Sequence, residues 1–172
     1  MLKRNFNIVQ IGNADTWNQD SPFLSAHVLE YYRRWLPDLL SKGYQMHRCS
    51  TDWYTSAIGT FEKSWVFKEG RWKKNTEPVK PDLILDKTRS ICEENVFKKL
   101  SQMNTQVPVI NNPHFRRLVE CKISQYSMFQ QYMPRTYLVR NKEDFKKRIS
   151  QIPGNMIVMK PLYGYGEKGF HV

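Results

Sequence analysis

The end of the sequence carries a lysine, a proline and three closely spaced glycines, a combination that can bind phosphate. In "MIVMKPLYGYGEKGFHV", Lys160 ends an apolar run, Pro161 follows it, and Gly164, Gly166 and Gly169 lie in the next few residues. Glycines let backbone N–H groups approach phosphate oxygens, and a lysine ammonium neutralises the charge of those oxygens. Such a loop can also close over a nucleotide and exclude water. The alternative is a glycine-rich turn without a ligand.

The glycine spacing also matches G-x-G-x-x-G, the fingerprint of dinucleotide-binding folds. That fingerprint needs a helix that begins in the loop and an acidic residue about twenty positions later, whereas three residues follow Gly169. The G-K-[ST] of a P-loop is missing, and His171 stands where the kinase glycine loop has valine. The remaining interpretation is a strand that ends at Lys160 and leads into a flexible phosphate-binding loop.

The chain is basic, and most of the excess positive charge lies in its last third. It has 27 Lys and Arg against 16 Asp and Glu, and residues 111–172 hold 11 and 4 of these. Proteins that bind phosphates or nucleic acids share such a charge, but solvated helix faces explain most of it. Nucleic acid is therefore not the expected partner.

Several classes of protein are not expected from this composition. No apolar run approaches the roughly 18 residues of a membrane span, and the apolar run near the first residue is too short for a secretion signal. The four histidines show no metal-ligand spacing. The three cysteines lie far apart without a C-x-x-C pair, which favours a reduced, cytoplasmic location; these are Cys49, Cys92 and Cys121.

Strand and helix patterns alternate through the first part of the chain. Ser21 is expected to cap the first helix, and Pro37 to kink or divide it. This alternation predicts a parallel sheet with helices on its faces, in which ligands bind beyond the carboxyl ends of the strands. The patterns predict strands at 6–12, 44–50, 80–87 and 107–112, and helices at 21–43 and 91–103.

A further stretch, "EKSWVFKEGRWKKN" (62–75), alternates aromatic and basic residues on both sides of a glycine. This pattern predicts an exposed β-hairpin. Its aromatic residues Trp65, Phe67 and Trp72 could pack on the protein or stack on a nucleic-acid base. Packing is the favoured interpretation, because aromatic residues of a hairpin normally cover the edge of a core.

The pattern changes at residue 113, where we place a boundary between two domains. A long helix is predicted over 112–132, a strand at 133–139, a short capped helix at 141–150, and a strand at 155–160 that enters the glycine loop. The predicted domains are therefore residues 1–112 and 113–172.

From residue 107 onward the sequence resembles the opening of an ATP-grasp domain, most closely that of the bacterial glutathione synthetase-like branch. The resemblance rests on the order of an "NNP" turn, a helix with a lysine, an "MPRT" segment, a short helix, a "K-P-L" strand end and the glycine loop. It implies an α/β fold: a pre-ATP-grasp, Rossmann-like parallel-sheet domain at 1–112, followed by the first, incomplete lobe of an ATP-grasp domain at 113–172.

The resemblance assigns nucleotide-binding roles to individual residues. Lys122, in the middle of the predicted long helix, and Lys160 match the two lysines that lie near the ATP phosphates. The loop over the phosphates matches Gly164, Tyr165, Gly166, Glu167, Lys168 and Gly169. Lys87 or Arg89, at the end of a predicted strand, could bind a substrate carboxylate, although a surface ion pair is at least as good an interpretation. Asp15, in the loop after the first predicted strand, is a weaker candidate for substrate binding.

The resemblance also implies a reaction, in which ATP activates a carboxylate as an acyl phosphate and an amine attacks it. The second lobe of such enzymes supplies the Mg²⁺ ligands, which we expect outside this chain, so no catalytic residue is assigned here. The expected partners are ATP, a carboxylate substrate, and either a C-terminal half or a second copy of the chain. Two alternatives are an inactive pre-ATP-grasp binding module and a basic nucleic-acid-binding protein.

Overall fold

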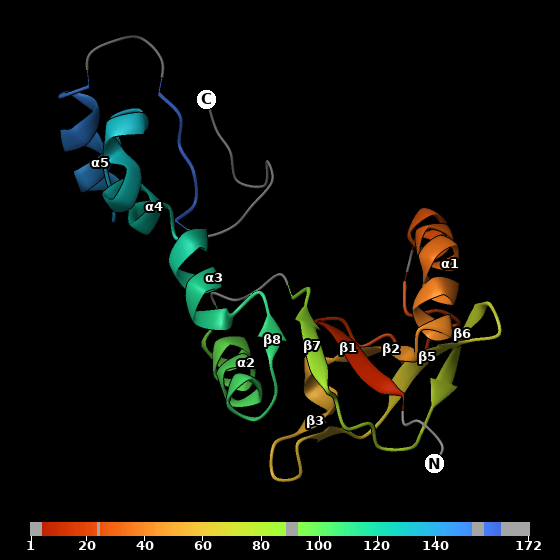
Figure 1. Cartoon of the computed structure of the whole chain (residues 1–172). Helices are drawn as coiled ribbons and strands as arrows, with labels where there is room; N and C mark the ends of the chain where they lie inside the picture. Colours follow the sequence, from red (N-terminus) through yellow and green to blue (C-terminus); the bar gives the residue numbers. More distant parts are fainter. Residues whose placement is uncertain (1–4, 24, 89–92, 153–156, 163–172) are drawn as a thin grey trace. The chain divides into compact units, whose positions relative to one another are not determined.

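The computed structural model describes residues 5–23, 25–88, 93–152 and 157–162 (Figure 1). Contacts divide the chain into two compact units, Met1–His114 and Phe115–Val172. Because this division reflects contacts alone, the assignment of residues 1–112 to a pre-ATP-grasp domain stays a prediction.

A six-stranded mixed sheet forms the centre of the first unit. Its strands are β1 (Phe6–Gly12), β2 (Tyr44–Ser50), β5 (Ser64–Lys68), β6 (Arg71–Asn75), β7 (Leu83–Asp86) and β8 (Val109–Ile110). They lie in the order β6-β5-β2-β1-β7-β8. Strands β2, β1, β7 and β8 are parallel, whereas β5 is antiparallel to β2 and β6 to β5. The α/β class is as predicted, but the sheet is only partly parallel.

The predicted hairpin at 62–75 is present, and it makes the sheet mixed. Strand β5 pairs with β2, with Val66 opposite His47, instead of standing free at the surface. Trp65 is 2% and Phe67 1% exposed, because pairing with the sheet removes both rings from water. The prediction that these aromatic side chains pack is confirmed, and the prediction of an exposed hairpin is wrong for β5.

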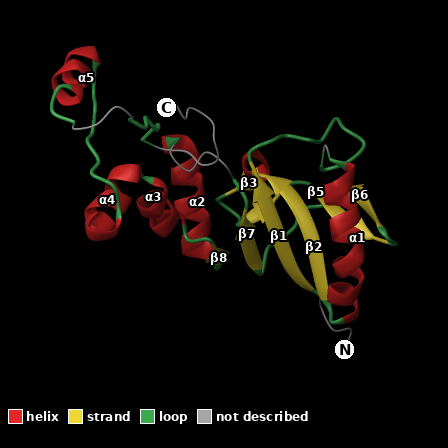
Figure 2. Ribbon diagram, turned by 90° about the horizontal axis from the view of Figure 1, so that it is seen from above, coloured by secondary structure: helices red, strands yellow, loops and turns green. Residues whose placement is uncertain are grey.

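Two helices cover opposite faces of the sheet (Figure 2). The first, α1 (Ala26–Ser41), connects β1 to β2 and packs Leu36 against a cluster that includes Met46. The second, α2 (Glu94–Gln106), follows β7 and packs Leu100 in a cluster with Val9 and Ile11. Since Met46 lies opposite Ile8 and successive residues of a strand face opposite sides, the two clusters lie on opposite faces.

Helix α1 begins later than predicted and is not divided. Ser25 occupies the cap position, whereas the Ser21 hydroxyl accepts a hydrogen bond from the Phe23 N–H (3.2 Å) in the preceding loop. The helix continues through Pro37 to Ser41. Gly43, with φ 84°, follows its end, as expected for a helix stop.

A small element that the sequence patterns did not indicate follows β2. It consists of a short 3-10 helix, η1 (Thr51–Trp53), and a two-stranded hairpin, β3 (Tyr54–Thr55) and β4 (Thr60–Phe61). Phe61 is fully buried, and its backbone exchanges two hydrogen bonds with Val79 (2.9 and 2.8 Å). The hairpin is thereby tied to the segment that enters β7.

The helix predicted over 112–132 is broken into three pieces. These are α3 (Pro113–Glu120), α4 (Lys122–Phe129) and the 3-10 helix η2 (Gln130–Tyr132). Cys121 between the first two is extended (φ −78°, ψ 118°), and the Lys122 N–H donates to the Leu162 carbonyl (2.9 Å). The continuous helix was a wrong prediction, because this tertiary hydrogen bond replaces an intrahelical one. Lys122 therefore begins a helix and does not lie in the middle of one.

The described residues of the second unit after η2 contain one further helix. Helix α5 (Lys142–Ile149) confirms the helix predicted at 141–150, and the Asn141 side chain caps it by accepting from the Asp144 N–H (2.8 Å). The described residues of 133–139 and 155–160 belong to no named strand, contrary to prediction. Among the described residues of these two segments, Met159 makes an isolated β-bridge, which is shorter than a strand.

Burial differs sharply between the two units. The buried hydrophobic side chains of the described residues all lie between Val9 and Val107. No described residue from His114 to Leu162 is buried.

None of the helices in the described ranges has the length and hydrophobicity needed to cross a bilayer.

Candidate functional site

The carboxyl ends of β1 and β7 form the position in this sheet where ligand sites are expected. The chain leaves β1 for β2 on one side, while β7 and β8 lie on the other side, so the order reverses between β1 and β7. Asp15 follows β1 and Lys87 follows β7, and the Lys87 N–H donates to the Ile11 carbonyl (3.0 Å). The structure thus brings the loops of these two predicted residues to one edge. Arg89 lies outside the described residues.

Both carboxylate oxygens of Asp15 accept hydrogen bonds from the chain itself. Oδ1 accepts from the Trp17 N–H (2.8 Å) and Oδ2 from the Trp53 indole N–H (3.3 Å). The two indole rings meet edge to face at 5.5 Å, and the Lys63 ammonium lies 4.9 Å from the Trp17 ring centre. Both oxygens of Asp15 are therefore used in holding the loop after β1 in its conformation.

A second acidic residue at this edge, Asp86, is 1% exposed at the end of β7. Its carboxylate accepts from the Thr88 N–H (2.8 Å), and its backbone carbonyl accepts from the Asn111 side chain (2.9 Å). Asn111 has φ 68°, a conformation that asparagine tolerates better than most residues. These bonds tie the loop after β7 to the end of β8 and leave the Lys87 side chain exposed.

Arg48 on β2 reaches the same edge, and we did not single it out in the sequence. It lies opposite Gln10 of β1, and its guanidinium lies over Gly12, the last residue of that strand. The guanidinium carbon is 5.5 Å from the centre of the Phe23 ring. Its Nη1 is buried and has no hydrogen-bond partner, and burial lowers the pKa of the group. The available signal was a charged residue inside the otherwise buried strand "YQMHRCS".

Two potentially reactive side chains of β2 lie on the face opposite to Arg48, and their buried surroundings suppress their reactivity. His47 Nδ1 lies 3.0 Å from the Ser64 hydroxyl, and burial together with the charge of Lys68 lowers the pKa of His47 to about 4. Burial raises the pKa of the Cys49 thiol well above its usual value. A neutral imidazole and a protonated thiol, both buried, serve packing rather than proton transfer or nucleophilic attack.

In the second unit, the structure brings together the segments of the two predicted nucleotide lysines. The hydrogen bond from Lys122 N–H to Leu162 places the start of α4 beside the residues that follow Lys160. Lys122 is half-buried and Lys160 exposed. The loop residues Gly164, Tyr165, Gly166, Glu167, Lys168 and Gly169 lie outside the described residues.

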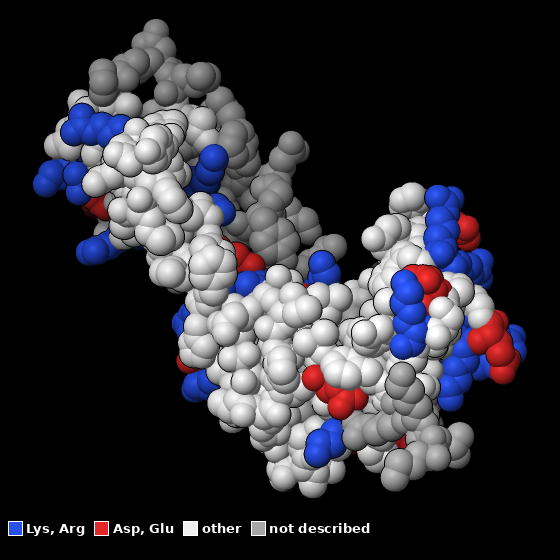
Figure 3. All heavy atoms as spheres, viewed as in Figure 1, with Lys and Arg blue, Asp and Glu red and all other residues white. Residues whose placement is uncertain are grey.

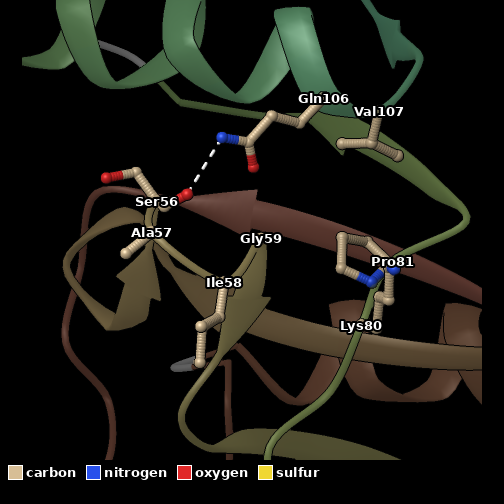
Figure 4. Close-up of a pocket in the computed structure, with 8 residues that line it drawn as sticks. All are labelled: Ser56, Ala57, Ile58, Gly59, Lys80, Pro81, Gln106 and Val107. Carbon is tan, nitrogen blue, oxygen red and sulfur yellow. Dashed lines mark hydrogen bonds between the residues drawn. The ribbon is translucent and has the colours of Figure 1, made fainter.

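A pocket of about 280 Å³ lies elsewhere in the first unit (Figure 4). It is formed by the β3–β4 turn, the segment before β7 and the end of α2, so it lies at the amino-terminal edge of the parallel strands. The Gln106 side chain spans it and donates to the Ser56 carbonyl (2.9 Å). None of the predicted site residues lines this pocket.

Charges on the visible face of the first unit are largely mixed in sign (Figure 3). Acidic residues of α1 and of the β5–β6 turn pair with basic neighbours: Glu30 with Arg33 and Arg34, Asp38 with Lys42, and Glu69 with Lys73. Within the described ranges, no three His, Cys, Asp or Glu side chains are grouped as a metal site would need.

Comparison with known proteins adds no assignment to this geometry. No protein-family model matches the sequence, and a search of curated proteins finds no significant match.

Proposed function

We propose that the chain is the N-terminal portion of an ATP-dependent carboxylate–amine ligase of the ATP-grasp type, similar to bacterial glutathione synthetases. The observation that carries the proposal is the hydrogen bond from Lys122 N–H to the Leu162 carbonyl (2.9 Å). It brings the helix start with one lysine beside the segment that follows the other lysine. Two ammonium groups on neighbouring segments are suited to the charge of a triphosphate.

In this proposal the two units have different tasks. Residues 113–172 contribute Lys122, Lys160 and the loop Gly164–Gly169 to the ATP phosphates, and the Mg²⁺ ligands come from outside this chain. Residues 1–112 form the pre-ATP-grasp domain, whose sheet edge receives the carboxylate substrate near Lys87 and Arg89, with Asp15 as a weaker candidate for substrate contact. ATP would activate that carboxylate as an acyl phosphate, which an amine then attacks. Such a ligase would work in the cytoplasm.

Calorimetric titration of the 172-residue chain with MgATP tests the nucleotide site. We expect Lys160→Ala and Lys122→Ala each to weaken binding roughly tenfold or more, because a charge-assisted contact to phosphate contributes about 1.5–3 kcal/mol. Lys147→Ala is the matched control: it removes an exposed lysine of α5 in the same unit and should leave the affinity unchanged.

Two results would contradict the proposal. The first is an ATP affinity that does not change in Lys160→Ala, and the second is no heat of binding at millimolar ATP. The second result would favour the binding module without a nucleotide. Binding of DNA or RNA that weakens steeply with salt would favour the nucleic-acid alternative, although the buried rings of Trp65 and Phe67 are not free to stack on bases.

A further inference from the structure

We infer that Arg48 is the anchor of an oxyanion-binding site at the end of β1, on the face of the sheet that α1 covers. The site belongs to the first unit and needs neither ATP nor the lysines of the second unit. It therefore goes beyond the proposed function, and it would hold even if the chain is not part of a ligase.

The first argument is the missing counter-charge of Arg48. No hydrogen bond or ion pair joins its side chain to another described residue, and its Nη1 is buried without a partner. The groups that act on its pKa are burial, which lowers it, and the Tyr32 and Cys49 side chains, which raise it; no carboxylate is among them. Buried charges in proteins are normally paired, so an unsatisfied one calls for an explanation, and a bound anion would supply it.

The second argument is the glycine beneath the guanidinium. A Cβ at Gly12 would lie 2.2 Å from Arg48 Nη2 and 2.8 Å from its Cζ, so any other residue there would displace the group. The φ of Gly12 is outside the left-handed region, so the backbone itself does not require glycine. Gly12 therefore provides the space in which the guanidinium lies across the end of the strand. That end is the edge at which α/β sheets bind ligands.

The third argument is the rigid surroundings of the charged group. The Phe23 ring stacks on Tyr32, with centroids 4.8 Å apart and planes 13° apart, and the Tyr32 hydroxyl donates to Gln10 Oε1 (2.6 Å). These contacts hold the ring that faces Arg48. Arg48 as a whole residue is half-buried, although its Nη1 is buried, so an anion would approach through the part of the residue that is open to solvent.

The planar fork of a guanidinium fits two oxygens of a carboxylate or a phosphate. Thermal unfolding of the full chain, with added sodium acetate or inorganic phosphate and with ionic strength held constant by NaCl, distinguishes these two. At about ten times its Kd, the anion that binds should raise the midpoint by roughly 3–5 °C. A rise with acetate identifies a carboxylate ligand, and a rise with phosphate identifies a phosphate ligand.

Three variants locate the response. Arg48→Met keeps much of the apolar stem and should lose the rise. Arg34→Met removes an exposed arginine of α1 and should keep it. Lys160→Ala should also keep it, so that failure of the nucleotide proposal and failure of this one can be told apart.

A second measurement does not depend on the folding of a variant. In the unsubstituted chain, the assigned Nε–H resonance of Arg48 should shift as the anion is added. The inference is overturned if neither anion raises the midpoint, if Arg48→Met keeps the rise, or if the Arg48 resonance does not move at the anion concentration that raises the midpoint.

Discussion

His47 shows how burial fixes the protonation state of a single residue. This residue of β2 is 6% exposed beside the hairpin strand β5, with its Nδ1 3.0 Å from the Ser64 hydroxyl. Burial, and secondarily the positive charge of Lys68, lowers the pKa of His47 from 6.5 to about 4. The folded protein therefore keeps this side chain neutral at pH values at which the unfolded chain already protonates it.

This difference predicts a loss of stability in acid. The unfolded state binds a proton at His47 near pH 6.5 and the folded state only near pH 4, so the free energy of unfolding falls as the pH falls through this window. The loss between pH 7 and pH 4.5 should be about 2–3 kcal/mol. Urea unfolding at both pH values measures it. The loss should be smaller by this amount in His47→Gln and unchanged in His27→Gln, where the histidine is exposed; equal losses in all three proteins would contradict a buried neutral His47.

A double-mutant cycle tests the packing of Arg48 on Gly12. Gly12→Ala should lower the free energy of unfolding by about 1–2 kcal/mol, since its Cβ would overlap the guanidinium and force it out of place. In an Arg48→Ala background the same substitution should be close to neutral, which gives a coupling energy of similar size. Urea denaturation of the four proteins supplies the cycle. Purely additive effects would mean that the guanidinium does not lie on Gly12.

At the scale of elements, the hairpin β5–β6 shows what local patterns could predict. The alternation of aromatic and basic residues around Glu69–Gly70 predicted the two strands and their turn. It could not place the hairpin in the sheet, because pairing of β5 with β2 joins residues far apart in the sequence, such as His47 and Val66. The burial of Trp65 follows from that pairing.

The turn of this hairpin predicts the effect of a local substitution. Glu69 and Gly70 both have positive φ, 51° and 73°, and glutamate adopts this conformation less readily than asparagine. Glu69→Asn should therefore raise the thermal midpoint by roughly 2–4 °C relative to Glu69→Gln. Both variants lose the ion pair with Lys73, so the comparison isolates the backbone. An equal or lower midpoint for Glu69→Asn would contradict this explanation.

The break at Cys121 shows the limit of helical periodicity. The pattern over 112–132 satisfies a single helix, and nothing local reveals that the Leu162 carbonyl takes the Lys122 N–H. For the same reason, Lys122 and Lys160 could be paired only through a resemblance to a family. Arg48 was missed because a basic residue within a strand normally faces solvent, and its position over Gly12 depends on the register of β1 and β2.

At the scale of the whole chain, composition predicted a core but not its distribution. The sequence has apolar residues throughout, yet in the described ranges Pro113 is the last buried one. Residues such as Leu138 and Val158, which are 38% and 49% exposed, lie in segments that the local pattern predicted as strands. Burial depends on partners from distant parts of the fold, so the local pattern could not reveal this exposure.

This distribution predicts that the cooperative stability of the chain resides in its first unit. Ile84→Ala removes a fully buried side chain of β7 and should lower the free energy of unfolding by about 2–5 kcal/mol, whereas Leu138→Ala should change it by less than about 0.5 kcal/mol. A fragment of residues 1–114 should retain a single cooperative urea transition, with the same loss on Ile84→Ala. A fragment of residues 115–172 should show none, because its described residues bury no side chain that could hold it together. A cooperative transition in that second fragment, or a large effect of Leu138→Ala in the full chain, would place part of the core in the second unit.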